Sequence, residues 1–174
     1  MRTKDIVLIA LLINVNACAQ TLEKERLELT QEFIQEIKNG ILSNEQIVEK
    51  YVVEGNYLKT DSTKQAVDQW MNDHRTVFNM DTIHFKFIKY SDHEEEFFVS
   101  DHPVGERETV QKLIFKLSRF DGSRSTDVNI GDLYAVILET KYDKGTIFIL
   151  FDNDNRMISF IGITMGYYTT LMQF

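Results

Sequence analysis

The sequence predicts an α+β fold in which N-terminal helices pack on an antiparallel sheet of about five to six strands. Between residues 21 and 80, apolar residues recur at steps of three and four, a pattern that indicates amphipathic helices. Between residues 82 and 171, short apolar runs alternate with clusters of Asn, Asp and Gly, a pattern typical of strands joined by hairpins. Helices followed by strands favour the α+β class, and 174 residues suit a single domain.

The first residues differ from the rest of the chain. Arg2 and Lys4 form a short basic head, and the apolar run Ile6–Val15 is interrupted only by Asn14. Ten residues are too few to cross a bilayer as a helix, which needs about twenty. A basic head, a short apolar run and small residues after it are the features of a secretory signal peptide. We therefore expect a signal peptide over residues 1–17 and one domain over residues 18–174.

The end of this segment, Val15-Asn16-Ala17-Cys18, resembles the lipobox of bacterial lipoproteins, although Asn16 departs from the usual pattern. The resemblance implies that the thiol of Cys18 carries a lipid, which anchors the protein to a membrane facing the periplasm. Cys18 is the single cysteine of the chain, so an intramolecular disulfide is excluded. Two other interpretations stay open. In one, ordinary signal-peptidase cleavage after Ala19 leaves a soluble periplasmic protein that begins at Gln20. In the other, Cys18 is merely part of a discarded peptide.

Three helices are expected after this point. The first covers Thr21–Lys38 and ends at Gly40. Its predicted apolar arc consists of Leu22, Leu27, Leu29, Phe33, Ile34, Ile37 and Ile41. The second begins at Ser43, which with Gln46 forms a capping box, and it ends near Gly55.

The third helix is expected to begin with a second capping box. Ser62 is followed three residues later by Gln65, and neither Pro nor Gly interrupts Thr60–Met80. Its apolar face includes Trp70 and His74, which are four residues apart and therefore adjacent on one face. We consider two roles for the pair. The two side chains could line a pocket with His74 as a base, or His74 could be a hydrogen-bonded residue at the edge of the core.

The second half predicts a series of strands. Leu133–Leu138 is apolar at every position, as expected of a strand covered by helices on one face and by another layer on the other. Residues 121–127 form a polar connection, and a final strand could follow Met157–Ile163. The predicted strands are Thr82–Tyr90, Glu96–Ser100, Glu108–Phe120, Leu133–Leu138, Thr146–Phe151, Met157–Ile163 and Gly166–Leu171.

The order of three helices before long strands resembles the cystatin-like α+β roll of the nuclear transport factor two superfamily. The hairpin Phe148–Ile163, with the sequence FILFDNDNRMISF, is similar to the closing strands of that superfamily. The resemblance implies N-terminal helices packed on a curved antiparallel sheet of about five to six strands, with a conical cavity between them. Members of the superfamily use this cavity for small apolar ligands or for isomerase and hydrolase chemistry, so the fold does not select a function.

Charge and motifs exclude several functions. The formal net charge is −8, with no basic stripe, which argues against nucleic acid as a partner. The chain has four histidines but no pair at zinc-binding spacing. Asp152–Asn155 resembles part of a calcium loop, yet Met157 and Ile163 stand where the loop needs Gly and Glu. Neither a nucleophile elbow nor a phosphate-binding glycine loop occurs, so we expect no metal and no cofactor.

These observations leave three functional hypotheses. The first is an envelope lipoprotein that acts as a non-catalytic binding module for an envelope protein or a small apolar ligand. The second is a periplasmic isomerase or hydrolase that uses a cavity beside Trp70 and His74. The third is a homodimer formed across an exposed sheet face that carries Tyr134, Tyr142, Tyr167 and Tyr168. The sequence alone does not identify a molecular activity.

Overall fold

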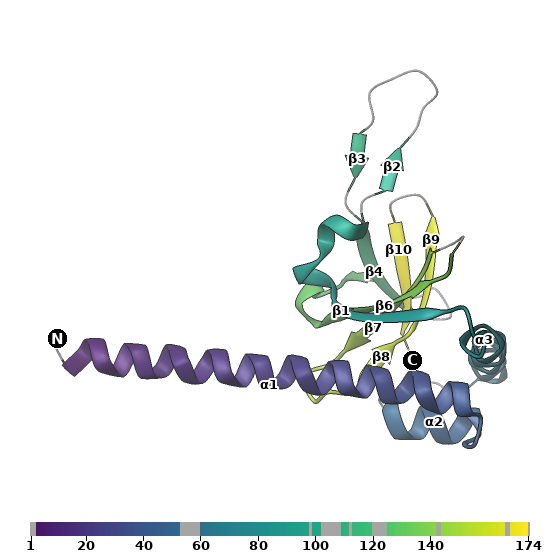
Figure 1. Ribbon diagram of the computed structural model, residues 1–174, viewed down its shortest axis with the longest axis horizontal. Helices are drawn as coiled ribbons and strands as arrows, with labels where there is room; N and C mark the ends of the chain where they lie inside the picture. The colour runs from purple at the N-terminus through teal and green to yellow at the C-terminus, as the bar shows by residue number, and fades with distance from the viewer. Residues whose placement is uncertain are drawn as a thin grey trace.

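The structure is a computed structural model (Figure 1). It describes residues 3–52, 60–97, 99–101, 109–111, 113–119, 125–141, 144–165 and 168–173. The helices are α1 (Thr3–Asn39), α2 (Asn44–Tyr51) and α3 (Asp61–Phe78), with short 3-10 turns η2 (Tyr90–Asp92), η3 (Glu94–Phe97) and η4 (Ile130–Asp132). The strands are β1 (His84–Lys89), β2 (Val99–Asp101), β3 (Thr109–Gln111), β4 (Ile114–Arg119), β5 (Ser125–Asp127), β6 (Leu133–Glu139), β7 (Lys144–Phe151), β8 (Met157–Ser159), β9 (Ile161–Met165) and β10 (Tyr168–Gln173).

The α+β class predicted from the sequence is confirmed, with the helices first and the strands after them. Within the described residues, the strands form two four-stranded sheets and one two-stranded ribbon. The central sheet has the order β1-β6-β7-β8, the outer sheet has the order β5-β4-β10-β9, and the ribbon pairs β2 with β3. The strands are therefore divided between sheets, where the sequence predicts one sheet. The pairing is antiparallel except between β4 and β10, which are parallel.

The central sheet is the middle layer of the molecule. Side chains of β6 alternate between two apolar clusters: Tyr134 and Val136 pack with the helices, whereas Leu133 and Ala135 pack with residues of the outer sheet. Six of the seven β6 residues are buried for this reason. The prediction that this strand has both faces covered is confirmed, and the second covering layer is a sheet.

Helix α1 lies along the central sheet with one stripe buried. Arg26, Thr30, Phe33, Ile34 and Ile37 lie at helical spacing, and each is at most 2% exposed. The helix ends at Gly40, whose φ of +64° is a left-handed conformation that glycine adopts without strain.

The apolar arc predicted for this helix is too long at both ends. Leu22 is 36% exposed and Ile41 is 82% exposed. Leu22 lies close to the point where the helix leaves the body, and Ile41 follows the Gly40 turn. Helical periodicity therefore identifies the buried face but not the length over which the body covers it.

The capping box of α2 is confirmed, because Ser43 and Gln46 bond to each other's backbone. The helix ends at Tyr51, earlier than predicted, and Val52 is extended and forms an isolated bridge to Met157. The predicted end near Gly55 lies outside the described residues.

Helix α3 begins two residues earlier than predicted. Thr60 is extended, and its hydroxyl accepts a hydrogen bond from the backbone N–H of Thr63 at 3.3 Å. Ser62 lies inside the helix, where its hydroxyl bonds to Thr60 Oγ1 at 3.3 Å. This start directs Thr63, Val67 and Met71 into the core, so packing selects one of two adjacent caps.

Two predicted strands are divided in the structure. The run Met157–Ile163 passes from the central sheet to the outer sheet at Phe160, which is 1% exposed, so β8 and β9 belong to different sheets. The run Glu108–Phe120 contains β3 and β4, which also belong to different sheets. An alternation of apolar and polar residues predicts a strand, but it does not predict which sheet the strand joins.

Two short segments also differ from the prediction. Part of the predicted polar connection, Ser125–Asp127, is strand β5 and pairs with β4. Glu96 and Phe97 lie in the turn η3, and the strand begins only at Val99. Short edge strands such as β5 are set by their partner rather than by an apolar pattern of their own.

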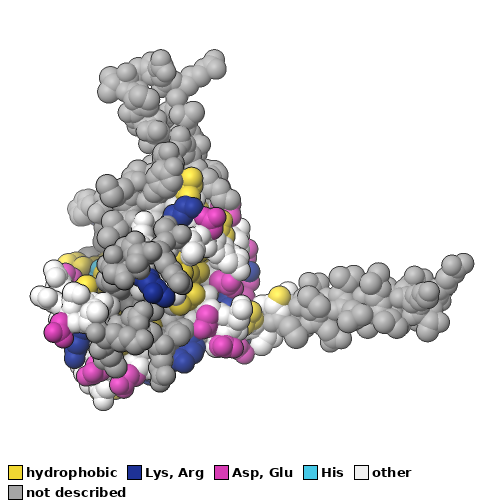
Figure 2. Space-filling model, turned by 180° about the vertical axis from the view of Figure 1, so that it is seen from behind, with side chains coloured by type: hydrophobic (Ala, Val, Ile, Leu, Met, Phe, Trp, Pro, Cys, Tyr) yellow, Lys and Arg dark blue, Asp and Glu magenta, His cyan; other side chains and the backbone are white. Residues whose placement is uncertain are grey.

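The N-terminal part of α1 projects away from the two sheets (Figure 1). Acidic and basic side chains are intermixed on the body around the root of this projection (Figure 2). Among the described residues, no helix combines the length and the apolar character that a bilayer-spanning segment requires.

Candidate functional site

The predicted pocket residues Trp70 and His74 are in contact on α3. Their rings are stacked, with centroids 3.9 Å apart and an interplanar angle of 23°. Trp70 also packs against Phe160 at 4.8 Å, and His74 packs against Phe78 at 5.6 Å. The pair therefore contributes to the contact between α3 and the turn that joins the two sheets.

The imidazole of His74 is bonded to the backbone of its own helix. Its Nδ1 lies 2.8 Å from the carbonyl oxygen of Trp70. A carbonyl oxygen only accepts, so Nδ1 carries the proton and donates. Burial lowers the pKa of His74, and the bond to Trp70 and the charge of Asp73 oppose this shift. The partner described for His74 is thus a carbonyl, whereas an activated base would be oriented by a carboxylate.

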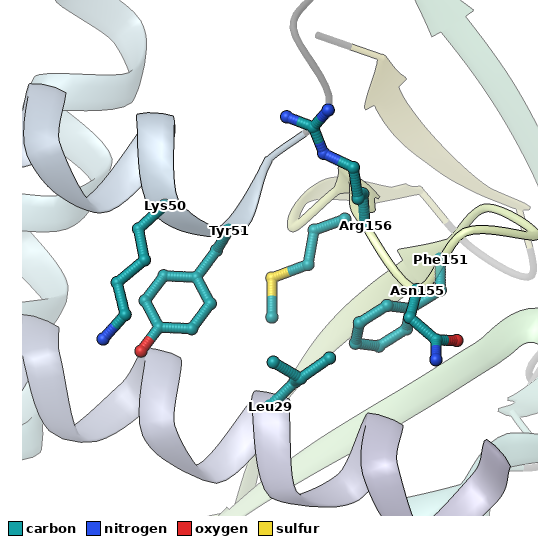
Figure 3. A pocket seen from close by; sticks show the side chains of 7 residues that line it. Leu29, Lys50, Tyr51, Phe151, Asn155 and Arg156 are labelled. Atoms are coloured by element: carbon teal, nitrogen blue, oxygen red, sulfur yellow. The ribbon is translucent and has the colours of Figure 1, made fainter.

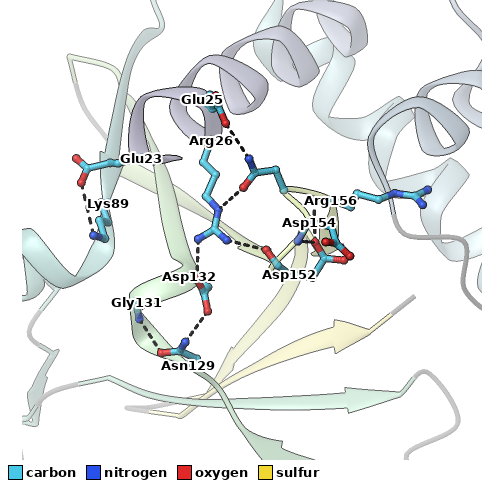
Figure 4. Close-up of polar contacts among 11 residues, drawn as sticks. Glu23, Glu25, Arg26, Lys89, Asn129, Gly131, Asp132, Asp152, Asp154 and Arg156 are labelled. Atoms are coloured by element: carbon cyan, nitrogen blue, oxygen red, sulfur yellow. Dashed lines mark hydrogen bonds and ion pairs between the residues drawn. The ribbon is translucent and has the colours of Figure 1, made fainter. Parts of the chain in front are cut away.

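A polar cluster surrounds Arg26, at the point where α1 enters the body (Figure 4). The Arg26 Nη1 donates to Asp132 Oδ1 at 2.6 Å, and Nη2 donates to the carbonyl oxygen of Asp152 at 2.6 Å. The Arg26 Nε donates to Asn155 Oδ1 at 3.0 Å. We call Arg26, Asp132, Asp152 and Asn155 the collar. It joins α1 to η4 on one side and to the β7–β8 turn on the other.

The turn between β7 and β8 is shaped to present these acceptors. The Asp152 carboxylate accepts hydrogen bonds from the backbone N–H groups of Asp154 and Arg156, both at 2.9 Å. Asn155 has φ of +60°, a left-handed conformation that asparagine tolerates better than most residues. Its Nδ2 donates to Glu25 at 3.0 Å, so its side chain bonds α1 twice. The sequence DNDN therefore forms a hairpin turn, as predicted, and also a receptor for Arg26.

Arg26 is buried at the centre of the collar, and its charge is paired with that of the partly exposed Asp132. The Arg26 side chain is 2% exposed and that of Asp132 is 20% exposed. The guanidinium carbon lies 5.5 Å from the Phe151 ring centre and 6.0 Å from that of Tyr134. Burial raises the pKa of Tyr134, and the charge of Arg26 opposes that rise. Each of the three guanidinium nitrogens of Arg26 has an acceptor within the fold. This arrangement is suited to holding α1 in place against the body.

A small pocket lies beside the collar (Figure 3). Leu29 of α1, Lys50 and Tyr51 of α2, and Phe151, Asn155, Arg156 and Met157 of the β7–β8 hairpin line it. Its volume is about 40 Å³, which holds a few water molecules. Pockets for drug-sized ligands enclose roughly 300–1,000 Å³. Trp70 and His74 do not line this pocket.

The other predicted site residues have different outcomes. Cys18 lies on α1, and its side chain is outside the described residues. Tyr134 is 1% exposed beneath the helices, so its predicted place on an exposed sheet face is wrong. Its strand is covered on both faces. Tyr142 and Tyr167 lie outside the described residues, as does the side chain of Tyr168.

The residue that the sequence reading missed is Arg26. It precedes Thr30, Phe33 and Ile37 by four, seven and eleven residues. That spacing places it on the buried stripe. A charge on an apolar stripe is a signal for a buried, paired group.

The described residues contain no group of three or more His, Cys, Asp and Glu side chains that could hold a metal ion. The chain matches no protein-family model, no curated protein and no solved structure.

Proposed function

We propose that this chain is an exported lipoprotein that is held at a membrane surface through Cys18 and whose body acts as a non-catalytic interaction module. The observation that carries the proposal is the position at which the body engages α1. Glu23 pairs with Lys89 of β1 at 3.5 Å, and Arg26 is the centre of the collar. Both follow Cys18 within eight residues, so removal of residues 1–17 leaves these anchoring contacts intact.

The state of the polar groups supports the non-catalytic part of the proposal. Arg26 is bonded to three acceptors that belong to the fold, and His74 donates to the carbonyl of its own helix. Such groups hold elements together and are not free to bind a substrate. The pocket beside the collar holds only a few water molecules.

The test is to express the full chain in a bacterial host that processes lipoproteins and to supply labelled palmitate. We expect label on the protein, recovery with membranes, and a mass that begins at a modified Cys18. The Cys18→Ser variant should lose the label and the membrane association, while Ala19→Ser, a similar change at the next residue, should keep both. A soluble product beginning at Gln20 would refute the lipid anchor, and a mature protein that retains Met1 would refute export.

A further inference from the structure

The distance between Cys18 and the body is short. Cys18 and Glu23 are five residues apart on α1, which corresponds to about 8 Å along a helix and to at most roughly 18 Å if the chain were fully extended. A lipid on Cys18 would therefore lie close to the collar. No flexible linker would then separate the lipid from the body, so the body could not reorient freely relative to the membrane.

The collar also prevents α1 from pivoting against the body. Asp132 of η4 bonds Arg26 on one side, and Asp152 and Asn155 bond it on the other. The pair between Glu23 and Lys89 adds a third element, β1. Three attachments that are not collinear fix the direction of the helix relative to the two sheets.

The exposed side of α1 does not suit contact with a bilayer along its length. Glu25, Glu28 and Glu32 are exposed on it. Lys24 is exposed as well, but it pairs with Glu28 at 3.6 Å. Membrane surfaces carry neutral or anionic headgroups, which attract clustered Lys and Arg rather than Glu. A helix anchored at its N-terminal end and acidic along its exposed side is expected to stand away from the membrane.

We infer that the α1 axis of the lipid-anchored protein points along the membrane normal. The collar is then at the end of the body nearest the bilayer, and the α1–α2 corner is at the end farthest from it. This inference rests on the lipid anchor proposed above. From Arg26 to Asn39 the helix rises by about 20 Å, so the corner at Ile41 lies about that much farther from the membrane than the β7–β8 turn.

Fluorescence energy transfer to the membrane tests the orientation. Asp154 in the β7–β8 turn and Ile41 at the corner are both exposed and can each be replaced by cysteine for donor labelling. Because the lipid occupies the thiol of Cys18, the introduced cysteine is the only reactive thiol. The mature lipidated protein is placed on phosphatidylcholine vesicles that carry an acceptor dye on a small fraction of headgroups. We expect strong transfer from the Asp154→Cys donor and weaker transfer from the Ile41→Cys donor, equivalent to about 20 Å of added distance.

A linker variant identifies the cause of the orientation. Ten Gly and Ser residues inserted between Gln20 and Thr21 should keep the protein on vesicles but remove the difference between the two donors. A difference that persists with the linker would refute the short tether as its cause. Equal transfer from both donors without the linker would refute the upright orientation. Protein that does not float with the vesicles at all would refute the lipid anchor, and this inference with it.

Discussion

Two buried polar side chains lie on opposite sides of the central sheet and differ in their partners. On the helix side, Arg26 is 2% exposed and donates to three acceptors. On the outer-sheet side, Tyr90 is fully buried among the rings of Phe97, Phe115 and Phe148, and its hydroxyl has no hydrogen-bond partner among the residues that the structure describes.

The difference shows where this fold needs polar groups. A buried polar group destabilises the native state unless its hydrogen bonds are made within the protein. Arg26 meets this condition and connects α1 to two segments that each lie more than one hundred residues away from it in sequence. Tyr90 does not meet it, so its contribution comes from the packing of its ring. We therefore expect the two residues to respond in opposite directions when the polar group is removed.

The largest effect is expected for Arg26→Met. The variant keeps the length of the side chain but leaves the Asp132 carboxylate without its cation. Removal of one member of a buried pair typically destabilises a protein by about 3–5 kcal/mol, and the partial exposure of Asp132 places our expectation near the lower end of that range. Urea denaturation measures the change.

The neighbouring Lys24→Met is the matched control for Arg26→Met. Lys24 is exposed and pairs with Glu28 at 3.6 Å within the helix, so its loss should change the free energy of unfolding by less than about 0.5 kcal/mol. Similar effects of the two substitutions would contradict the role of the collar. In the Arg26→Met background, Asp132→Asn should recover part of the lost stability.

The next effect is expected for Asn155→Ala, at about 2 kcal/mol. This variant loses the acceptor of Arg26 and the donor to Glu25, and it places alanine at φ of +60°. Asn155→Gly should be destabilised by about half as much, because glycine adopts this backbone conformation freely. Asn153→Ala, in the exposed part of the same turn, is the control. Denaturation midpoints that rank Asn155→Gly below Asn155→Ala would contradict the contribution that we assign to the left-handed backbone at residue 155.

Tyr90→Phe should stabilise the protein by about 1 kcal/mol at neutral pH, because it removes an unpaired buried hydroxyl and keeps the ring. The equally buried Tyr134 borders Arg26 on the other side of the sheet, so Tyr134→Phe should give no such gain. Chemical denaturation of both variants decides between them. Destabilisation by Tyr90→Phe would indicate that the hydroxyl has a partner.

The same residue predicts a loss of stability at alkaline pH. Burial raises the pKa of Tyr90 from 10.0 to about 12. The folded protein therefore holds this proton more tightly than the unfolded chain, and its contribution is present below pH 10 and lost as the pH rises toward 12. Tyr90→Phe should remove this part of the alkaline loss, which thermal melts between pH 9 and 12 would measure.

The smallest effect is expected for His74, which is half-buried and donates one hydrogen bond. Its pKa is lowered by burial, so the unfolded chain takes up a proton first and stability falls as the pH drops below 6.5. His74→Gln should therefore reduce the slope of the unfolding free energy against pH below pH 6.5.

The sequence predicts individual helices and strands more reliably than it predicts how they pack together. The capping box at Ser43, the Gly40 helix end and the two-sided burial of Leu133–Leu138 are all found in the structure. Each depends on residues within a few positions of one another. The cap of α3 was misplaced from Thr60 to Ser62, because both positions satisfy the local pattern and only packing against the core distinguishes them.

The contacts of the candidate site could not be predicted from local patterns in the sequence. Arg26 and its partners Asp132, Asp152 and Asn155 are separated by 106–129 residues. The DNDN turn was identified as a hairpin and the helix as amphipathic, but nothing local indicates that one binds the other. The pair Trp70 and His74 was found because it lies one helical turn apart, where the spacing itself guarantees contact.

Local patterns in the chain predict the α+β class, the helix-first order and the apolar strands, because helical and strand periodicities are properties of short segments. It also carries the signal-like segment that ends at Cys18. Three features are visible only in the folded protein. The strands divide between two sheets at Phe160, Arg26 is buried, and Tyr134 lies beneath helices. These outcomes depend on which distant surfaces meet, since burial belongs to the assembled layers rather than to any one segment.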